Sequence, residues 1–185
     1  TEIVLRSDEM STAYEAQFGA PIDLAGAPDA GTKFITDLFA NDLILVGSTD
    51  DVNAAVGKTG QTNPPIGFTT YSDRRDNEDE GWSLQVANDV APAPGIIFPA
   101  VVALATGAKN PAAARLAIDF LMGDASDTGG DGFKPFYVAG DYATRSDIVP
   151  HPDAIPLADF NGWSIDPAKT ADARAAVGDL VLTLQ

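Results

Sequence analysis

The chain has 185 residues, 27 of them acidic and 11 basic, and its formal net charge of −16 sets the first limits on function. Because a polyanion is repelled by such a surface, nucleic acid is excluded as a partner. The apolar fraction of 45% is typical of a folded chain, and no apolar run is long enough to span a membrane. The absence of cysteine excludes disulfides and thiolate metal sites and suits an exported protein.

Helix-like and strand-like segments alternate along the chain. Helices are predicted from capping residues and apolar stripes at residues 10–18, 33–40, 48–60, 72–81, 110–124 and 166–184. Strands are predicted from short apolar runs at residues 2–5, 42–47, 64–71, 82–88 and 96–107. Pro99 confines the last of these to a sheet edge or a bulge.

This alternation predicts an α/β fold with a mixed, mostly parallel sheet and helices on both faces. Residues 89–95 (DVAPAPG) break the pattern with Ala and Pro, which suits a crossover between two lobes. We therefore expect one lobe at residues 1–90 and part of another at residues 91–185.

Several motifs, in their order, resemble one protein family. They are GAKNPAAARLAIDFLMGD at residues 107–124, TRSDIVPHPDAIPL at 144–157, WSIDPAKTADARAAV at 163–177 and, upstream, STDDVNAAVGKTGQTNPPIGFTTYSDRRDNEDEG at 48–81. This order resembles the extracellular solute-binding proteins of bacterial ABC importers, in the ferric-iron and small-anion branch with the type II periplasmic binding fold.

The resemblance implies a receptor that binds a small molecule or ion between two lobes, one complete here and one partial, and delivers it to an ABC permease in the membrane. It further implies a monomer without a cofactor and without catalysis, located in the periplasm or outside the cell. Residues 1–10 lack the basic and apolar regions of a signal peptide, so we expect that peptide to be absent from this chain.

Ligand-binding residues follow from the same resemblance. In this family the ligand is held at helix N-termini and strand ends, where free backbone N–H groups favour anions. RSDEMST resembles the anion loop of phosphate-binding relatives, TTYSD stands where iron-binding relatives have adjacent tyrosines, and a hydroxyl-capped helix start lies between them. The implied ligand residues are Arg6, Ser7, Asp8, Ser11, Thr12, Ser48, Thr49, Thr70, Tyr71, Ser72 and Asp73.

The solute stays open between ferric iron and a small oxyanion such as phosphate or phosphonate. Glu9 and Met10 replace the Gly and Ser of the phosphate-binding pattern, and Ser72 stands where a second tyrosine would bind iron. A structural interpretation also stays open, in which Arg6 and its neighbours cap and pair on a surface helix and Tyr71 is an edge aromatic.

Two other classes of protein fit the residues less well. A hydrolase needs a nucleophile and a base, and the chain has no Cys, no G-x-S-x-G motif and one histidine, His151, between two prolines. A calcium-stabilised extracellular interaction domain is the alternative function, because Asp124, Asp127 and Asp131 lie in one Gly-rich loop at residues 123–132. The spacing of these acids is not that of an EF-hand.

Overall fold

The computed structural model describes all 185 residues and is mostly helical, with 44% of the chain in helices. The strands are two residues long, and they pair as a single two-stranded sheet. The predicted α/β fold of the type II periplasmic binding class, with its mixed and mostly parallel sheet, is therefore wrong.

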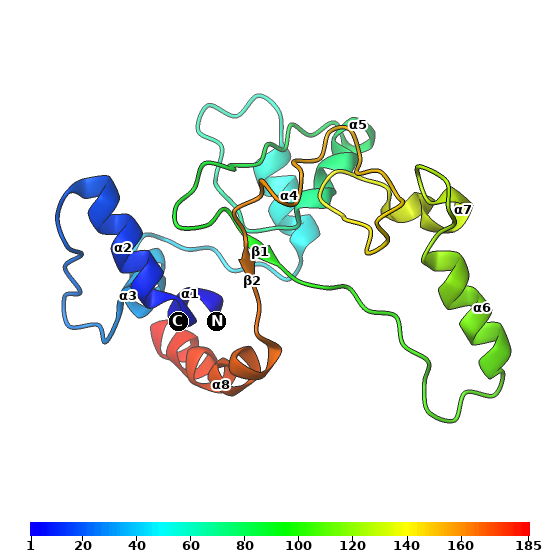
Figure 1. Cartoon of the computed structure of the whole chain (residues 1–185). Coiled ribbons are helices and arrows are strands. Elements are labelled where there is room, and N and C mark those ends of the chain that lie inside the picture. The colour runs from blue at the N-terminus through cyan, green and yellow to red at the C-terminus, as the bar shows by residue number, and fades with distance from the viewer. The chain divides into compact units, whose positions relative to one another are not determined.

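The chain divides into two compact units, and each is built from segments that are distant in the sequence (Figure 1). Unit 1 comprises Thr1–Leu45, Ala87–Phe98 and Asn161–Gln185, and unit 2 comprises Val46–Val86 and Pro99–Phe160. The lobes expected at residues 1–90 and 91–185 stay a prediction.

Unit 1 is a small helical cluster to which both ends of the chain contribute. Its elements are α1 (Glu2–Leu5), α2 (Ser7–Phe18), α3 (Ala30–Ala40), β1 (Ile96–Ile97), β2 (Trp163–Ser164) and α8 (Pro167–Leu184). The short helix α1 contacts α2, α3 and α8 (Figure 1). The buried apolar residues of unit 1 are Ala30 and Trp163. The two strands pair in parallel, with Ile96 opposite Trp163.

Unit 2 consists of short helices joined by long connections. Its elements are α4 (Thr49–Gly57), η1 (Tyr71–Asp76), α5 (Asn77–Glu80), α6 (Pro111–Leu121), α7 (Gly130–Phe133) and η2 (Lys134–Phe136). Its buried apolar residues are Leu84 and Ile148, and Gly57 of α4 lies directly against the ring of Trp82. The most deeply buried side chain is polar, Asn53, at 1% exposure.

Helices with clear caps are confirmed. Asp29 and Ser48 each accept a backbone N–H in the first turn of their helix, three residues further along. Asp166 accepts two such N–H groups at the start of α8, where proline occupies the first helical position. The helices predicted at residues 10–18, 33–40, 48–60, 110–124 and 166–184 correspond to α2, α3, α4, α6 and α8.

The predicted strands account for the error in fold class. Residues 2–5 form the helix α1, residues 42–47 and 64–71 form no strand, and only Ile96–Ile97 of residues 96–107 is paired. Residues 82–88 contribute a single bridge, between Trp82 and Lys58. An apolar run shows that a segment is suited to a sheet, whereas a strand exists only where a partner accepts and donates its hydrogen bonds.

The unpaired apolar segments leave large side chains in contact with solvent. Ile66 is 95% exposed, Val101 82% and Ile44 81%, and each lies in a segment that was predicted as a strand. No helix of the chain combines the length and the apolar character that a membrane crossing requires.

The contact between α1 and α3 leaves no room for a side chain at Gly31. A methyl group added there would lie 2.6 Å from Val4 Cα and would meet the carbonyl oxygen of Ile3. We expect Gly31→Ala to lower the free energy of unfolding by about 1–3 kcal/mol, measured by urea denaturation, because the two helices must move apart.

Gly178→Ala is the matched control, since Gly178 also lies in a helix but has open space around it. This substitution should raise stability slightly, by up to about 1 kcal/mol, through helix propensity alone. Equal effects of the two substitutions would contradict the close approach of α1 to α3.

Candidate functional site

The hydroxyl of Ser7 joins three helices of unit 1. Its Oγ lies 2.7 Å from Asp29 Oδ1 and 2.8 Å from the carbonyl oxygen of Val4, and it accepts the N–H of Gly31 at 3.0 Å. Asp29 Oδ1 also accepts the Thr32 N–H at 2.8 Å and so caps α3. Ser7 thus satisfies backbone groups of α1 and α3 from the start of α2.

The environment of Asp29 favours its charged form. Partial burial alone would raise the pKa of the carboxyl, but the hydrogen bonds from Thr32, Ser7 and Gly31 outweigh it, and the net result is a lowered pKa. A carboxylate with a lowered pKa stabilises the folded state at neutral pH, and this contribution is lost when the group is protonated.

Arg6 is the centre of a charged cluster in unit 1. Its guanidinium donates to Glu9 Oε1 at 2.8 Å and to the Ser164 carbonyl oxygen at 2.7 Å, and its Nε lies 3.6 Å from Glu2 Oε2. It also lies 5.5 Å from the centre of the Trp163 ring, whose Nε1 donates to Glu9 Oε2 at 2.9 Å. The hydrogen bond from Arg6, chiefly, holds the pKa of Glu9 below its ordinary value.

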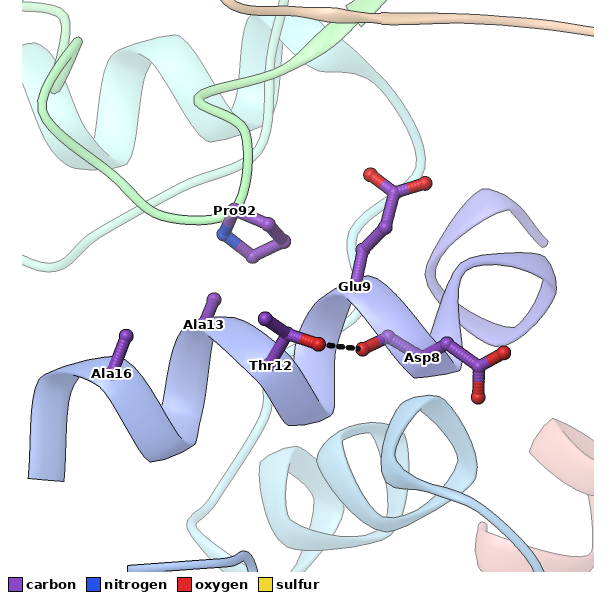
Figure 2. Close-up of a pocket in the computed structure, with 6 residues that line it drawn as sticks. All are labelled: Asp8, Glu9, Thr12, Ala13, Ala16 and Pro92. Atoms are coloured by element: carbon purple, nitrogen blue, oxygen red, sulfur yellow. Dashed lines mark hydrogen bonds between the residues drawn. The ribbon is translucent and has the colours of Figure 1, made fainter. Parts of the chain in front are cut away.

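A groove of about 390 Å³ runs along α2 beneath Pro92 (Figure 2). Its lining residues are Asp8, Glu9, Thr12, Ala13, Ala16 and Pro92. The Asp8 carboxylate points away from Pro92, and the Thr12 hydroxyl donates to the Asp8 carbonyl oxygen at 2.9 Å (Figure 2). Both carboxylate oxygens of Glu9 already accept hydrogen bonds, so the groove offers a ligand mainly apolar surface.

The predicted ligand residues of the first motif thus have unequal environments. Arg6 and Ser7 make several contacts that join parts of unit 1, whereas Asp8 and Thr12 line the groove and Ser11 is partly exposed on α2. Arg6 and Ser7 thus make structural contacts in unit 1, and their role in ligand binding stays a prediction.

Ser48 and Thr49 lie at the start of α4 in unit 2. Ser48 Oγ accepts the Asp51 N–H at 3.1 Å and lies 3.0 Å from Asp51 Oδ2, and Thr49 is exposed. The hydroxyl of Ser48 is thereby occupied as the helix cap.

Asn53 organises the polar core of unit 2. Its Nδ2 donates to Asp73 Oδ2 at 2.8 Å, and its Oδ1 accepts the hydroxyl of Thr69 at 2.7 Å. Thr69 Oγ1 also lies 3.1 Å from Asp73 Oδ2, which closes a triangle of three side chains. Asp73, a predicted ligand residue, therefore accepts from Asn53 and has the Thr69 hydroxyl beside it.

Tyr71 begins η1 and belongs to an aromatic cluster. Its ring stacks on Phe160 with 6.2 Å between centroids, and the Arg74 guanidinium lies 4.6 Å from its ring centre. Ser72 is buried at 5% exposure against Gly140, where an added Cβ would lie 2.7 Å from the Ser72 nitrogen. No hydrogen bond within the protein uses the Tyr71 hydroxyl.

Tyr142 completes this cluster. Its hydroxyl donates to the carbonyl oxygen of Ile155 at 2.7 Å. Burial raises the pKa of the Tyr142 phenol, the nearby Tyr71 adds to the rise, and the positive charge of Arg74 opposes it. Tyr142 and Arg74 were not predicted as site residues, because Arg74 lies just beyond the motif TTYSD and a single tyrosine in a loop carries no sequence signal.

The acidic loop at residues 123–132 is closed by its own side chains. Asp124 Oδ1 accepts the backbone N–H and the hydroxyl of Ser126, and these bonds hold its pKa below the ordinary value. A hollow of about 220 Å³ lies beside the loop, lined in part by Asp119, Asp124 and Asp131. No three acidic or histidine side chains of the chain are grouped so that they could hold a metal ion.

The predicted ligand residues fall into two groups that lie in different units. Arg6, Ser7, Asp8, Ser11 and Thr12 belong to unit 1, whereas Ser48, Thr49, Thr70, Tyr71, Ser72 and Asp73 belong to unit 2. Within unit 2 the structure brings Tyr71, Ser72 and Asp73 together on η1, and Thr70 directly precedes them as an exposed residue.

Comparison with known proteins identifies no relative. No family model matches the chain, and no curated protein or solved structure is significantly similar to it. The functional interpretation therefore depends on the residues themselves.

The cap at Asp29 predicts a pH-dependent stability of unit 1. Asp29→Ala should lower the free energy of unfolding by about 1 kcal/mol at neutral pH. The Thr32 N–H and the Ser7 hydroxyl lose their acceptor, and the Ser7 oxygen that accepts the Gly31 N–H is no longer held by Asp29. Since the folded pKa is lowered, this contribution is complete above the ordinary value of 3.8 and is lost as the pH falls through the folded pKa.

Urea denaturation of the native chain and of Asp29→Ala between neutral and acid pH tests this expectation. Glu15→Ala, at an exposed residue of α2, is the control and should show no such pH-dependent difference. A difference between the native chain and Asp29→Ala that persists undiminished at the acid end would contradict the capping role of the charged form.

The triangle around Asn53 predicts a second local effect. Asn53→Ala removes a buried donor from Asp73 and a buried acceptor from Thr69, so the free energy of unfolding should fall by about 1–3 kcal/mol in urea denaturation. The control is Asn63→Ala at an exposed loop residue, which should change stability by less than about 0.5 kcal/mol. Equal stabilities of the two variants would rule out the polar core.

Proposed function

We propose that this chain is the solute-binding component of a bacterial ABC importer, which captures a small oxyanion or ferric iron outside the cytoplasmic membrane and passes it to a permease. Its partners would be that solute and the permease, and it would act as a monomer, without catalysis and without a cofactor. We propose the function of that family and not its fold, because the sheet expected for the family is absent.

The observation that carries the proposal is the position of Tyr71. The motif TTYSD places a ligand residue here by resemblance, and in the structure the Tyr71 hydroxyl has no protein partner. A phenol whose ring is fixed by Phe160 and Arg74 while its hydroxyl is free can offer an oxygen to a metal ion or a hydrogen bond to an anion.

Binding is favoured over catalysis by the state of the single histidine. The backbone N–H of Asp153 donates to His151 Nδ1 at 3.2 Å, and the ring lies 5.3 Å from that of Tyr137. A general base needs a nucleophile within hydrogen-bond reach, and the hydrogen bonds of the chain place no serine or threonine hydroxyl beside this imidazole.

The test is a thermal-shift panel with ferric citrate, phosphate, sulfate, methylphosphonate and calcium, followed by titration calorimetry of any solute that raises the melting temperature. A ligand at about 100 times its Kd adds about 2.7 kcal/mol to the stability of the folded state, so a specific solute should stand out. Tyr71→Phe, which removes only the hydroxyl, should weaken the binding of that solute about tenfold or more, as expected for the loss of one hydrogen bond to a charged ligand.

Tyr14→Phe is the matched control, because Tyr14 is exposed on α2 and packs only on Phe18. Binding that survives Tyr71→Phe unchanged would remove Tyr71 from the site, and the absence of binding to every solute would refute the proposed function. A shift with calcium alone that disappears in Asp127→Ala would instead support the calcium-stabilised interaction domain.

A further inference from the structure

Arg74 is the only basic side chain that is partly buried and has no acidic partner. The ion pairs of the chain engage Arg6, Lys33, Arg75, Arg145, His151 and Lys169. The other five basic residues that lack such a pair, Lys58, Lys109, Arg115, Lys134 and Arg174, are all exposed to water. Arg74 alone is partly buried, and its Nε is buried without a hydrogen bond.

This state of Arg74 is unusual in a chain with 27 acidic residues. The nearest carboxylates in the sequence have other partners, since Asp73 accepts from Asn53 and Asp76 lies 3.8 Å from Arg75. The buried Nε–H of Arg74 is removed from water and needs an acceptor. No hydrogen bond of the protein supplies one, and the rest of the guanidinium is left to bind water or a ligand.

The surroundings fix the guanidinium in place. The Tyr71 ring lies 4.6 Å from its central carbon and covers one side of the group, while Phe160 stacks on that ring. An arginine whose guanidinium stacks on an aromatic ring loses less conformational freedom on binding a ligand, so its fork of N–H donors is preorganised.

We propose that Arg74, backed by the Tyr71 ring in unit 2, is the anion-binding residue of this chain and takes a small oxyanion that presents two oxygens. The inference rests on the proposed function and narrows its solute, because a positive charge 4.6 Å from the centre of the Tyr71 ring favours an anion and opposes ferric iron. A phosphate, phosphonate or carboxylate group matches the two parallel donors of a guanidinium.

The experiment titrates inorganic phosphate and acetate, at constant ionic strength set with chloride, into the native chain, Arg74→Gln and Arg75→Gln. Arg75 is the matched control, since it carries the same charge next along the chain but is exposed and donates to the Pro135 carbonyl oxygen. Binding is followed by calorimetry and by the NMR signal of the Arg74 Nε–Hε group, which reports contact with the guanidinium directly.

We expect one of the two anions to bind the native chain and Arg75→Gln with similar affinity, to shift the Arg74 Nε–Hε signal, and to bind Arg74→Gln at least tenfold more weakly. Arg74→Lys, which keeps the charge but lacks the planar fork, should also bind more weakly and serves if Arg74→Gln does not fold. Phosphate selected over acetate would assign the phosphate class of solute, and the reverse would assign a carboxylate.

Equal binding to the native chain and Arg74→Gln, or no binding of either anion to the native chain, would overturn the inference. The proposed function has its own test, because ferric citrate binding that depends on Tyr71, where phosphate, acetate and metal-free citrate do not bind, would uphold solute binding while excluding an anion at Arg74. The absence of binding across the whole panel would instead refute both.

Discussion

Regular secondary structure in this protein is almost entirely helical, and the rest of its structure depends on how those helices are capped and joined. The one sheet contributes pairs at Ile96 and Ile97 only, and the terminal N–H groups of each helix need partners outside the helix's own hydrogen bonds. Asp29, Ser48 and Asp166 provide them, and each cap also sets where its helix begins. The connections between helices are left to be held by side chains.

Buried polar groups hold those connections in place. Ser7 links α1, α2 and α3 through Val4, Asp29 and Gly31, and Asn53 links α4 to the start of η1. The two junctions concentrate several hydrogen bonds on one side chain each, in units with few buried apolar residues. Such junctions define a specific geometry, because every buried donor and acceptor must be matched at once. Tyr71 of the aromatic cluster lies between Thr69 and Asp73 of this network, two positions from each.

The sequence allowed the helices to be predicted well, because their signals are local. A cap such as Ser48, a proline at the first turn of α6 or α8, and an apolar stripe act within a few residues. Strands depend on a partner elsewhere in the chain, and residues 42–47 and 64–71 were wrongly assigned because their composition suits a sheet that does not form.

The candidate site divides in the same way. Tyr71 and Asp73 were predicted from a local motif, and the structure places them on one short helix. The significance of Arg74 could not be predicted, since it depends on what is absent around the guanidinium. Sequence reasoning also could not separate the structural role of Arg6 from a ligand role, because both use the same charged group.

The way in which unit 1 is assembled has a consequence during synthesis on the ribosome. Helix α1, at the start of the chain, packs on α8 near its end, and the Thr170 hydroxyl donates to Glu2 Oε1 at 2.6 Å across a separation of 168 residues. Because all of unit 2 lies between α1 and α8 in the sequence, α1 cannot complete its packing until α8 has been synthesised. Unit 2 can therefore fold before unit 1 is completed.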